Sequence, residues 1–243
     1  MRIIKLDAID STNSFLRQLS VKERIEDYTV VMTDYQTHGR GQMGTKWASE
    51  QSKNLMVSVF KEVTALTVEK NFYISMVVSL SILKALESLQ IKKLKIKWPN
   101  DILSDNKKVA GVLIENVIKQ NQLQASIIGI GLNVNQTEFR DLPNATSLLL
   151  LLGKVFDLEE VVHELLKQLR LHFQLLENGQ LNRLKAAYEI NLFRKDKPST
   201  FKNVYDELFI GIILGITASG NLKVQIEDGI IKEYHLKEIT LLY

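Results

Sequence analysis

Cysteine is absent from this chain of 243 residues. Its absence excludes disulfide frameworks, thiolate nucleophiles, cysteine-based zinc sites and iron–sulfur ligation, and it favours a reducing compartment. Long apolar runs are missing as well: the uncharged stretch over residues 71–83 is shorter than the ~20 residues of a membrane-spanning helix. Asp7 lies where a signal peptide would carry its apolar core. We therefore expect a cytoplasmic protein without a membrane segment.

A strong excess of one charge is also lacking, since 31 Lys and Arg residues face 28 Asp and Glu residues, for a formal net charge of +3. A dedicated nucleic-acid-binding protein usually concentrates its basic residues on one face. The lysines of residues 92–97 fit the solvated face of a strand better than such a stripe. The 4 histidines lie far apart without metal-site spacing, and no G-x-S-x-G nucleophile elbow occurs.

Hydrophobic periodicity predicts that the chain has two parts with different secondary structure. Strands are expected over residues 28–34, 54–63, 94–98, 108–117 and 124–134, and helices over residues 69–89, 157–177 and 181–192. Asp157 and Glu160 form a capping-box pattern, and Asn178-Gly179 ends that helix. After residues 195–198, only short strands follow, over residues 207–217, 222–227, 230–234 and 238–242. We expect a larger α+β domain over residues 1–193 and a small β-barrel over residues 194–243.

A glycine-rich segment, Gln36 to Trp47, follows the first of these strands. Its glycines fit the G-x-G-x-x-G spacing, but no crossover helix follows, and Thr45-Lys46 reverses the order that a P-loop requires. An anion-binding loop remains, in which backbone N–H groups and Arg40 approach a phosphate or carboxylate and Trp47 stacks on an aromatic ligand. The alternative is a surface loop with a core tryptophan.

Three further polar clusters are candidates for a binding site. The strand ending at Pro99 exposes Asn100 and Asp101 in a turn, and Lys108 begins the next strand with its ammonium free for a phosphate; a basic turn that favours solubility is the alternative. Asp10-Ser-Thr-Asn-Ser14 fits a helix N-cap, although the same groups suit a small polar ligand. Asn133 and Asn135 follow the end of a strand, where a side-chain amide can hydrogen-bond to the edge of a nucleotide base. A turn is the alternative.

These motifs, in this order, resemble the biotin–protein ligases. The carriers are Asp10-Ser-Thr-Asn13, Gln36-Thr-His-Gly-Arg-Gly-Gln-Met-Gly44 with Trp47, Lys97-Trp-Pro-Asn-Asp101, Lys108-Val-Ala-Gly111 and Ile128-Gly-Ile-Gly-Leu-Asn133. Each motif is modest, but the ordered set is specific and covers essentially the whole chain. The resemblance implies a catalytic domain similar to class II aminoacyl-tRNA synthetases, with a mixed sheet and flanking helices, and a small all-β barrel after it. The chain resembles the type that lacks an N-terminal DNA-binding domain.

The resemblance implies an ATP-dependent ligase that acts in two steps. The biotin carboxylate attacks the α-phosphate of ATP to give biotinyl-adenylate and pyrophosphate, and a lysine of a biotin carboxyl carrier protein domain then attacks the mixed anhydride. Lys108 and Arg40, with Mg²⁺, would offset the charge of the transition state, and Asp101 is a candidate metal ligand. The partner would be a biotin-dependent carboxylase, with neither DNA nor membrane involved, and relatives often form homodimers through the catalytic-domain sheet.

Two overlapping sets of residues are implied to bind the substrates. Biotin would contact Ser11, Thr12, Asn13, Gln36, Gly39, Arg40, Gly41, Gln42, Lys108 and Gly111. ATP and the adenylate would contact Arg40, Trp47, Lys97, Asn100, Lys108 and Asn133. The chain departs from the family at Gln42, where a second arginine is frequent, and at Lys237, where a glycine is common. Gln42 would weaken the hold on the adenylate unless a nearby cation such as Lys46 compensates.

Three other functions are weighed against this hypothesis. A lipoate or octanoate transferase of related fold is disfavoured because its arginine-rich triple-glycine motif is absent. A nucleic-acid-binding module is disfavoured by the scattered lysines. A non-catalytic biotin-binding protein is disfavoured because Arg40 and Lys108 are both present.

Overall fold

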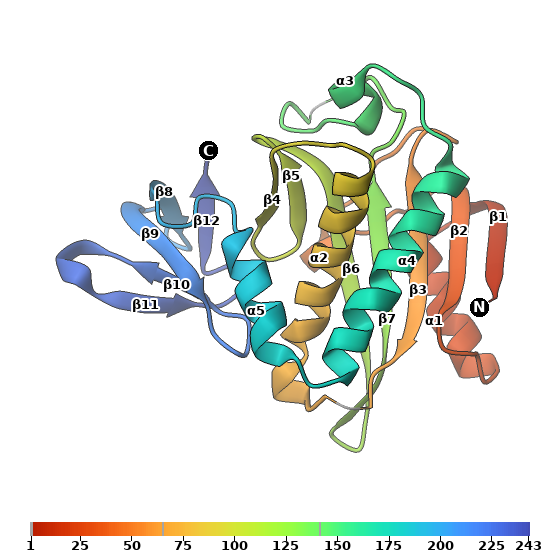
Figure 1. The fold of residues 1–243 in the computed structure, drawn as a ribbon, viewed down its shortest axis with the longest axis horizontal. Coiled ribbons are helices and arrows are strands. Elements are labelled where there is room, and N and C mark those ends of the chain that lie inside the picture. The colour runs from red at the N-terminus through yellow and green to blue at the C-terminus, as the bar shows by residue number, and fades with distance from the viewer. Residues whose placement is uncertain (1, 65, 141) are drawn as a thin grey trace.

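A mixed β-sheet forms the centre of the larger part of the molecule in the computed structural model, which describes residues 2–64, 66–140 and 142–243. Its strands are β1 (Ile3–Ile9), β2 (Thr29–Gln36), β3 (Leu55–Glu62), β4 (Leu94–Lys97), β5 (Asp101–Ser104), β6 (Lys107–Lys119) and β7 (Gln122–Leu132). They lie in the order β1-β2-β3-β7-β6-β5-β4 (Figure 1). The pair β1 and β2 is parallel and the other neighbours are antiparallel, as expected of a mixed sheet.

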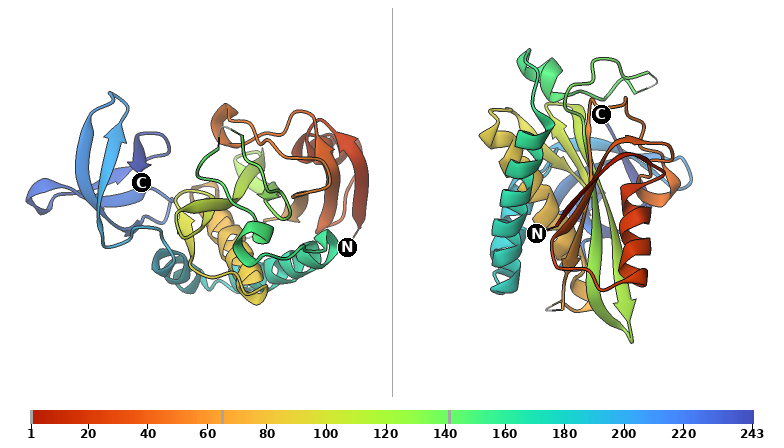
Figure 2. Two further views of the ribbon diagram at one scale, coloured as in Figure 1. Left: turned by 90° about the horizontal axis from the view of Figure 1, so that it is seen from above. Right: turned by 90° about the vertical axis from the view of Figure 1, so that its right-hand side faces the viewer.

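Helices cover both faces of this sheet. The helices are α1 (Thr12–Lys22), α2 (Phe72–Ser88), α3 (Leu148–Leu152), α4 (Leu158–Glu177) and α5 (Leu181–Ile190). Viewed along the sheet, α1 lies on one face, and α2 and α4 lie on the other (Figure 2, right). The helix α2 is apolar on nearly all sides because it is enclosed between the sheet and α4; Ile74, Met76 and Val77 are all 0% exposed.

The predicted helix ends agree only in part with the structure. The Asp157 side chain accepts a hydrogen bond from the N–H of Glu159 at 2.8 Å, so Asp157 caps α4 as expected. Among the described residues, Glu160 makes no return bond to Asp157, so the expected capping box is only half formed. Likewise α2 begins at Phe72 rather than residue 69, because a 3₁₀ turn over Val68–Lys70 precedes it.

A second, antiparallel sheet follows, as predicted from the run of strands near the C-terminus. It contains β8 (Pro198–Asn203), β9 (Leu208–Ile216), β10 (Leu222–Gln225), β11 (Ile231–Tyr234) and β12 (Ile239–Leu242), in the order β11-β10-β9-β8-β12. In the β10–β11 turn, Asp228 and Gly229 both have positive φ, which this residue pair tolerates. A 3₁₀ turn over Glu227–Gly229 makes the connection longer than the expected two-residue hairpin.

The two sheets are joined by specific contacts. The Trp98 Nε1–H donates to the carbonyl of Gly220 at 2.9 Å. The N–H of Ile216 donates to the Glu189 carboxylate at 2.9 Å, which ties β9 to α5. These bonds hold the second sheet beside the β4 and β5 end of the first, as Figures 1 and 2 show.

The sequence patterns missed three strands, β1, β5 and β8. Asp101 lies at the start of β5 and pairs with Lys97 and Gly111 rather than lying in an exposed turn. The prediction was wrong because β5 is flanked by turn-forming residues and is too short to show a period, so its pairing partners define it. Among the described residues, no helix is both long and apolar enough to cross a bilayer.

Candidate functional site

A row of paired residues crosses the sheet at the candidate site. In register, Met56 of β3 lies beside Gly131 of β7, Gly131 beside Gly111 of β6, Gly111 beside Asp101 of β5, and Asp101 beside Lys97 of β4. All five line a cavity of about 440 Å³. Because the middle of the row consists of glycines, the sheet presents bare backbone there, and a flat group can lie directly on it.

Trp47 occupies part of this bare surface. A Cβ atom added to Gly131 would overlap the Trp47 indole, and one added to Gly111 would lie 3.0 Å from it. The Lys108 Nζ lies 5.5 Å from the centre of the Trp47 ring, within the range of a cation–π contact. Within the described part of the chain the buried Trp47 Nε1–H has no hydrogen-bond partner, so a ligand acceptor could satisfy it.

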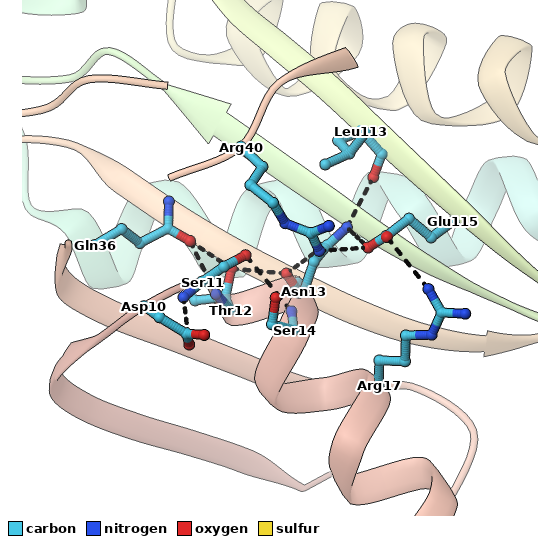
Figure 3. A network of polar contacts seen from close by, with 11 residues as sticks. Asp10, Ser11, Thr12, Asn13, Ser14, Arg17, Gln36, Arg40, Leu113 and Glu115 are labelled. Atoms are coloured by element: carbon cyan, nitrogen blue, oxygen red, sulfur yellow. Dashed lines mark hydrogen bonds and ion pairs between the residues drawn. The ribbon is translucent and has the colours of Figure 1, made fainter. Parts of the chain in front are cut away.

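Neutral hydrogen-bonding groups form the cavity wall beside β2, β3 and β7. They come from the N-terminus of α1, where Ser11 caps the helix and Thr12 and Asn13 are buried. The Thr12 N–H donates to the Gln36 Oε1 at 2.9 Å, and the Ser58 hydroxyl lies 2.7 Å from the Thr12 hydroxyl. Figure 3 shows the Ser11, Thr12, Asn13 and Gln36 side chains lying close together. The cap thus both begins a helix and forms a polar wall.

The glycine-rich loop folds back on itself. The Trp47 N–H donates to the carbonyl of Gly39 at 3.0 Å, and the Gly41 N–H donates to the carbonyl of Thr45 at 2.7 Å. The Gly41 N–H therefore bonds within the loop and is not available to an anion. This differs from the predicted anion-binding loop, in which the glycine N–H groups face the ligand. What the loop presents to the cavity includes the side chains of Arg40 and Gln42.

Positive charge gathers toward β4, β5 and β6. The Lys108 ammonium lies 2.6 Å from the Asp101 carboxylate, and the Lys97 ammonium lies 4.9 Å above the Tyr243 ring. Among the described lining residues the cations are Arg40, Lys46, Lys97, Lys108 and Lys237, and the carboxylate is Asp101. This balance attracts an anionic ligand, because low-dielectric walls concentrate the field.

The second sheet closes the cavity, which the sequence did not reveal. Its lining includes Leu236, Lys237, Ile239, Thr240 and Leu241. Lys237 lies at φ 71°, where a glycine would be unstrained. Burial and the nearby Asp101 raise the pKa of the Tyr243 phenol. No sequence motif marked these residues as lining, apart from the departure at Lys237.

Two of the expected site residues lie apart from the described lining of the cavity. Gly39 is buried within the glycine-rich loop, against the carbonyl of Trp47. Asn133 is 4% exposed, and its Nδ2 donates to the carbonyl of Thr146 at 3.0 Å. The Asn133 amide thus holds the chain after β7, and its N–H₂ group is engaged away from the cavity. The other expected residues all line the cavity.

The described residues offer no self-sufficient metal site, since no group of three His, Cys, Asp or Glu side chains converges among them. Asp101, the candidate ligand, already pairs with Lys108. A divalent cation here would need oxygen ligands from a bound anion and water, as Mg²⁺ commonly has.

The chain is similar to known proteins along most of its length. A family model described as the biotin/lipoate A/B protein ligase family matches residues 6–133. The bifunctional ligase/repressor BirA of Escherichia coli is 30% identical over 247 residues, covering 97% of this chain and 73% of that protein. The biotin--[acetyl-CoA-carboxylase] ligase of Mycobacterium tuberculosis is 32% identical over 162 residues, covering 65% of this chain and 59% of that protein.

Solved structures match the fold as well. The biotin protein ligase from Aquifex aeolicus in complex with biotin and ATP superposes with a TM-score of 0.82 at 29% identity, covering 99% of this chain and 98% of that one. The biotin protein ligase from Leishmania major in complex with biotinyl-5-AMP has a TM-score of 0.63 at 22% identity, covering 96% of this chain and 98% of that one, and so shares the fold.

Proposed function

This chain belongs to the biotin/lipoate A/B protein ligase family, and from this premise we propose that it is a biotin–protein ligase. It activates biotin with ATP as biotinyl-adenylate and transfers the biotinyl group to a lysine of a biotin carboxyl carrier protein domain. The observation that carries this proposal is the division of one cavity into a neutral hydrogen-bonding wall and a cationic wall, joined by bare glycine backbone.

The two walls suit the two substrates of the first step. Biotin carries a neutral ureido ring, which fits the hydroxyl and amide groups of Ser11, Thr12, Asn13 and Gln36. Its carboxylate extends over Gly111 toward the cations. The nucleotide lies toward Trp47, Lys97 and Asn100, of which Asn100 is fixed by donating its Nδ2–H to the carbonyl of Val112 at 2.6 Å. Asn133 has its amide N–H₂ engaged with Thr146, so a contact to adenine would use the Asn133 Oδ1.

In the first step a biotin carboxylate oxygen attacks the α-phosphorus of ATP, and the bond from that phosphorus to the bridging oxygen of the β-phosphate breaks. Pyrophosphate leaves with the bonding electrons. Two anions must approach each other, so the barrier falls when fixed cations offset their charge. Lys108 and Arg40 fill this role, and Asp101 holds the Lys108 ammonium at 2.6 Å in a defined position.

In the second step the neutral amine of the acceptor lysine attacks the acyl carbon of biotinyl-adenylate. The carbon–oxygen bond to AMP breaks, AMP leaves, and the amine loses a proton as the amide forms. Until then the mixed anhydride must be kept from water. Trp47 and the glycine-rich loop over residues 39–47 lie over the cavity floor and serve as this cover.

Magnesium enters this proposal with ATP as its phosphate-bound complex. Mg²⁺ is commonly held by substrate phosphates with one or two carboxylates, and among the described lining residues Asp101 supplies a carboxylate. We place the enzyme in the cytoplasm, with the carrier domain of a biotin-dependent carboxylase as its partner, and without DNA binding. The homodimer would form through the catalytic sheet, of which β1 is an edge strand.

A single assay tests the proposal. The protein is incubated with MgATP, biotin and a biotin carboxyl carrier domain, and the carrier is weighed by mass spectrometry. We expect a mass increase of one biotinyl group that depends on ATP, and none when lipoate replaces biotin. An increase with lipoate would instead indicate a lipoate transferase. Biotin binding without any mass increase would indicate a non-catalytic biotin-binding protein.

A further inference from the structure

Glu115 lies behind the cavity lining, in contact with Asn13 and Arg40, and no motif assigned it a role. It belongs to β6, and its side chain is 19% exposed. Its Oε2 accepts from the Asn13 Nδ2 at 2.9 Å and from the Arg40 Nη2 at 3.0 Å, while its Oε1 lies 3.6 Å from the Arg17 Nη1. Figure 3 shows the three donors converging on this carboxylate from α1 and from the glycine-rich loop.

Glu115 holds the Arg40 guanidinium by one edge. The contact uses the Nη2 atom, and within the described residues it is the hydrogen bond that fixes this side chain. A guanidinium has five N–H donors in a rigid fork, so the remaining donors stay available to a ligand in the cavity that Arg40 lines. An ionised partner also makes this bond stronger than a neutral one.

The charge of the cluster still favours an anion. Arg17 and Arg40 carry two positive charges against the single negative charge of Glu115, which leaves an excess of one. Arg17 does not line the cavity among the described residues, whereas Arg40 does. Arg17 thus helps to balance Glu115, and Glu115 can anchor Arg40 without cancelling the attraction of the site for an anion.

Glu115 and the carbonyl of Leu113, which accepts from the Asn13 Nδ2 at 3.3 Å, together fix which way the Asn13 amide faces. A carboxylate only accepts hydrogen bonds, so the donor at 2.9 Å must be the Asn13 Nδ2. On the other side, the Ser58 hydroxyl donates to the Asn13 Oδ1, which lies directly over Gly129. The amide is therefore held in one of its two orientations, beside Thr12 in the polar wall.

We propose that Glu115 is a positioning residue for the ligase reaction: it holds Arg40 on the phosphate side and Asn13 on the biotin side of the same cavity, through a single carboxylate on a rigid strand. It lies outside the described lining of the cavity, so it acts through these two residues and not on the substrates. The role in catalysis rests on the proposed ligase function.

The kinetic test is a double-mutant cycle on biotin-dependent pyrophosphate exchange. Glu115→Gln preserves the shape and removes the charge, and we expect kcat/KM to fall about tenfold. In a protein that already carries Arg40→Gln, the Glu115→Gln substitution should lower kcat/KM by at most about twofold, because Arg40, the main partner of Glu115, is already absent. The matched control is Glu23→Gln, which removes the Arg2–Glu23 pair at the same distance of 3.0 Å and should leave the rate unchanged. Equal losses in both backgrounds, or no loss from Glu115→Gln alone, would overturn the proposal.

A second measurement does not depend on ligase activity. Trypsin cleaves after arginine and lysine, so cleavage at Arg40 and Lys46 reports how firmly the loop is held. We expect Glu115→Gln to speed cleavage at these sites by roughly threefold or more in the folded protein, and Glu23→Gln to have no effect. Unchanged cleavage would contradict the anchoring of Arg40. Faster cleavage in a chain that proves to lack ligase activity would refute the proposed function and leave the anchoring intact.

Discussion

At the scale of single residues, Lys108 is a cation of the cavity that two neighbouring side chains hold in place. It lies between the Asp101 carboxylate at 2.6 Å and the face of Trp47. A lysine held in this way offers a point charge to a phosphate without the entropic cost of ordering a free side chain at the moment of reaction.

Lys108→Ala should therefore lower the rate of biotin-dependent pyrophosphate exchange by about 100-fold or more, since one preorganised charge contributes that much. The fold should persist, because the Lys108 side chain is 34% exposed and its partner Asp101 is not fully buried. Circular dichroism checks the fold. Lys107→Ala, at the neighbouring exposed position of β6, is the matched control, and near-normal activity of Lys108→Ala would remove Lys108 from the mechanism.

Gln42 is a neutral residue among the cations of the loop. It lines the cavity together with Arg40 and Lys46, where a further arginine could hold the adenylate phosphate. We expect Gln42→Arg to slow the dissociation of biotinyl-adenylate by about tenfold.

The off-rate is measured by chasing bound adenylate with excess unlabelled biotin and ATP. If Lys46 already compensates for the neutral residue, Lys46→Ala should speed release in the native chain. Equal off-rates for the native protein and Gln42→Arg, with no effect of Lys46→Ala, would contradict the prediction that Gln42 speeds the dissociation of biotinyl-adenylate.

At the scale of elements, helix ends both define the fold and supply the site. The N-terminus of α1 contributes Ser11 as a cap and Thr12 and Asn13 as cavity wall, so its cap is part of the binding site. The N-terminus of α4 lies on the opposite face of the sheet, so its cap contributes to stability alone.

Asp157→Ala should lower the free energy of unfolding by about 1 kcal/mol, the usual value of a lost N-cap, and leave ligase activity unchanged. Urea unfolding followed by circular dichroism measures the loss. Glu160→Ala is the control, because within the described residues the structure shows no bond from Glu160 to the Asp157 N–H. If both variants lost the same stability, the reciprocal capping box would be present in solution after all.

At the scale of the whole molecule, the second sheet completes the cavity, and the contacts that dock it become part of the function. Glu189 of α5 accepts the Ile216 N–H at 2.9 Å, and Ile216 is 0% exposed. Breaking this bond leaves a buried N–H without a partner, which is costly.

Glu189→Ala should therefore lower the free energy of unfolding by about 1–2 kcal/mol and raise the KM for ATP, because the residues of β12 would no longer face the cations of the first sheet at a fixed distance. Glu233→Ala, on the exposed strand β11, is the control. An unchanged KM in a destabilised Glu189→Ala protein would show that the docking of the second sheet does not shape the site.

Local patterns were sufficient for much of this protein. Neighbouring residues were enough to predict the nearly all-round apolar surface of α2, the cap at Asp157 and the change to strands near Pro198, and the structure confirms all three. The division into domains at residues 193 and 194 stays a prediction, although the second sheet begins at Pro198. The glycine loop and the cations were identified because glycine backbone N–H groups and positively charged side chains are suited to binding an anion.

Only the tertiary structure decided what these residues face. The strand register brings Gly131, Gly111, Asp101 and Lys97 into one row, and the chain crossings give Arg40 its partner Glu115, 75 residues away. Tertiary contacts also engage the Asn133 amide N–H₂ with the carbonyl of Thr146, away from the cavity. The packing of the second sheet brings Lys237 into the cavity lining. The physical reason is that spacing along a chain fixes local conformation, whereas side-chain partners depend on pairing between distant strands, and this pairing is set by burial of the whole core.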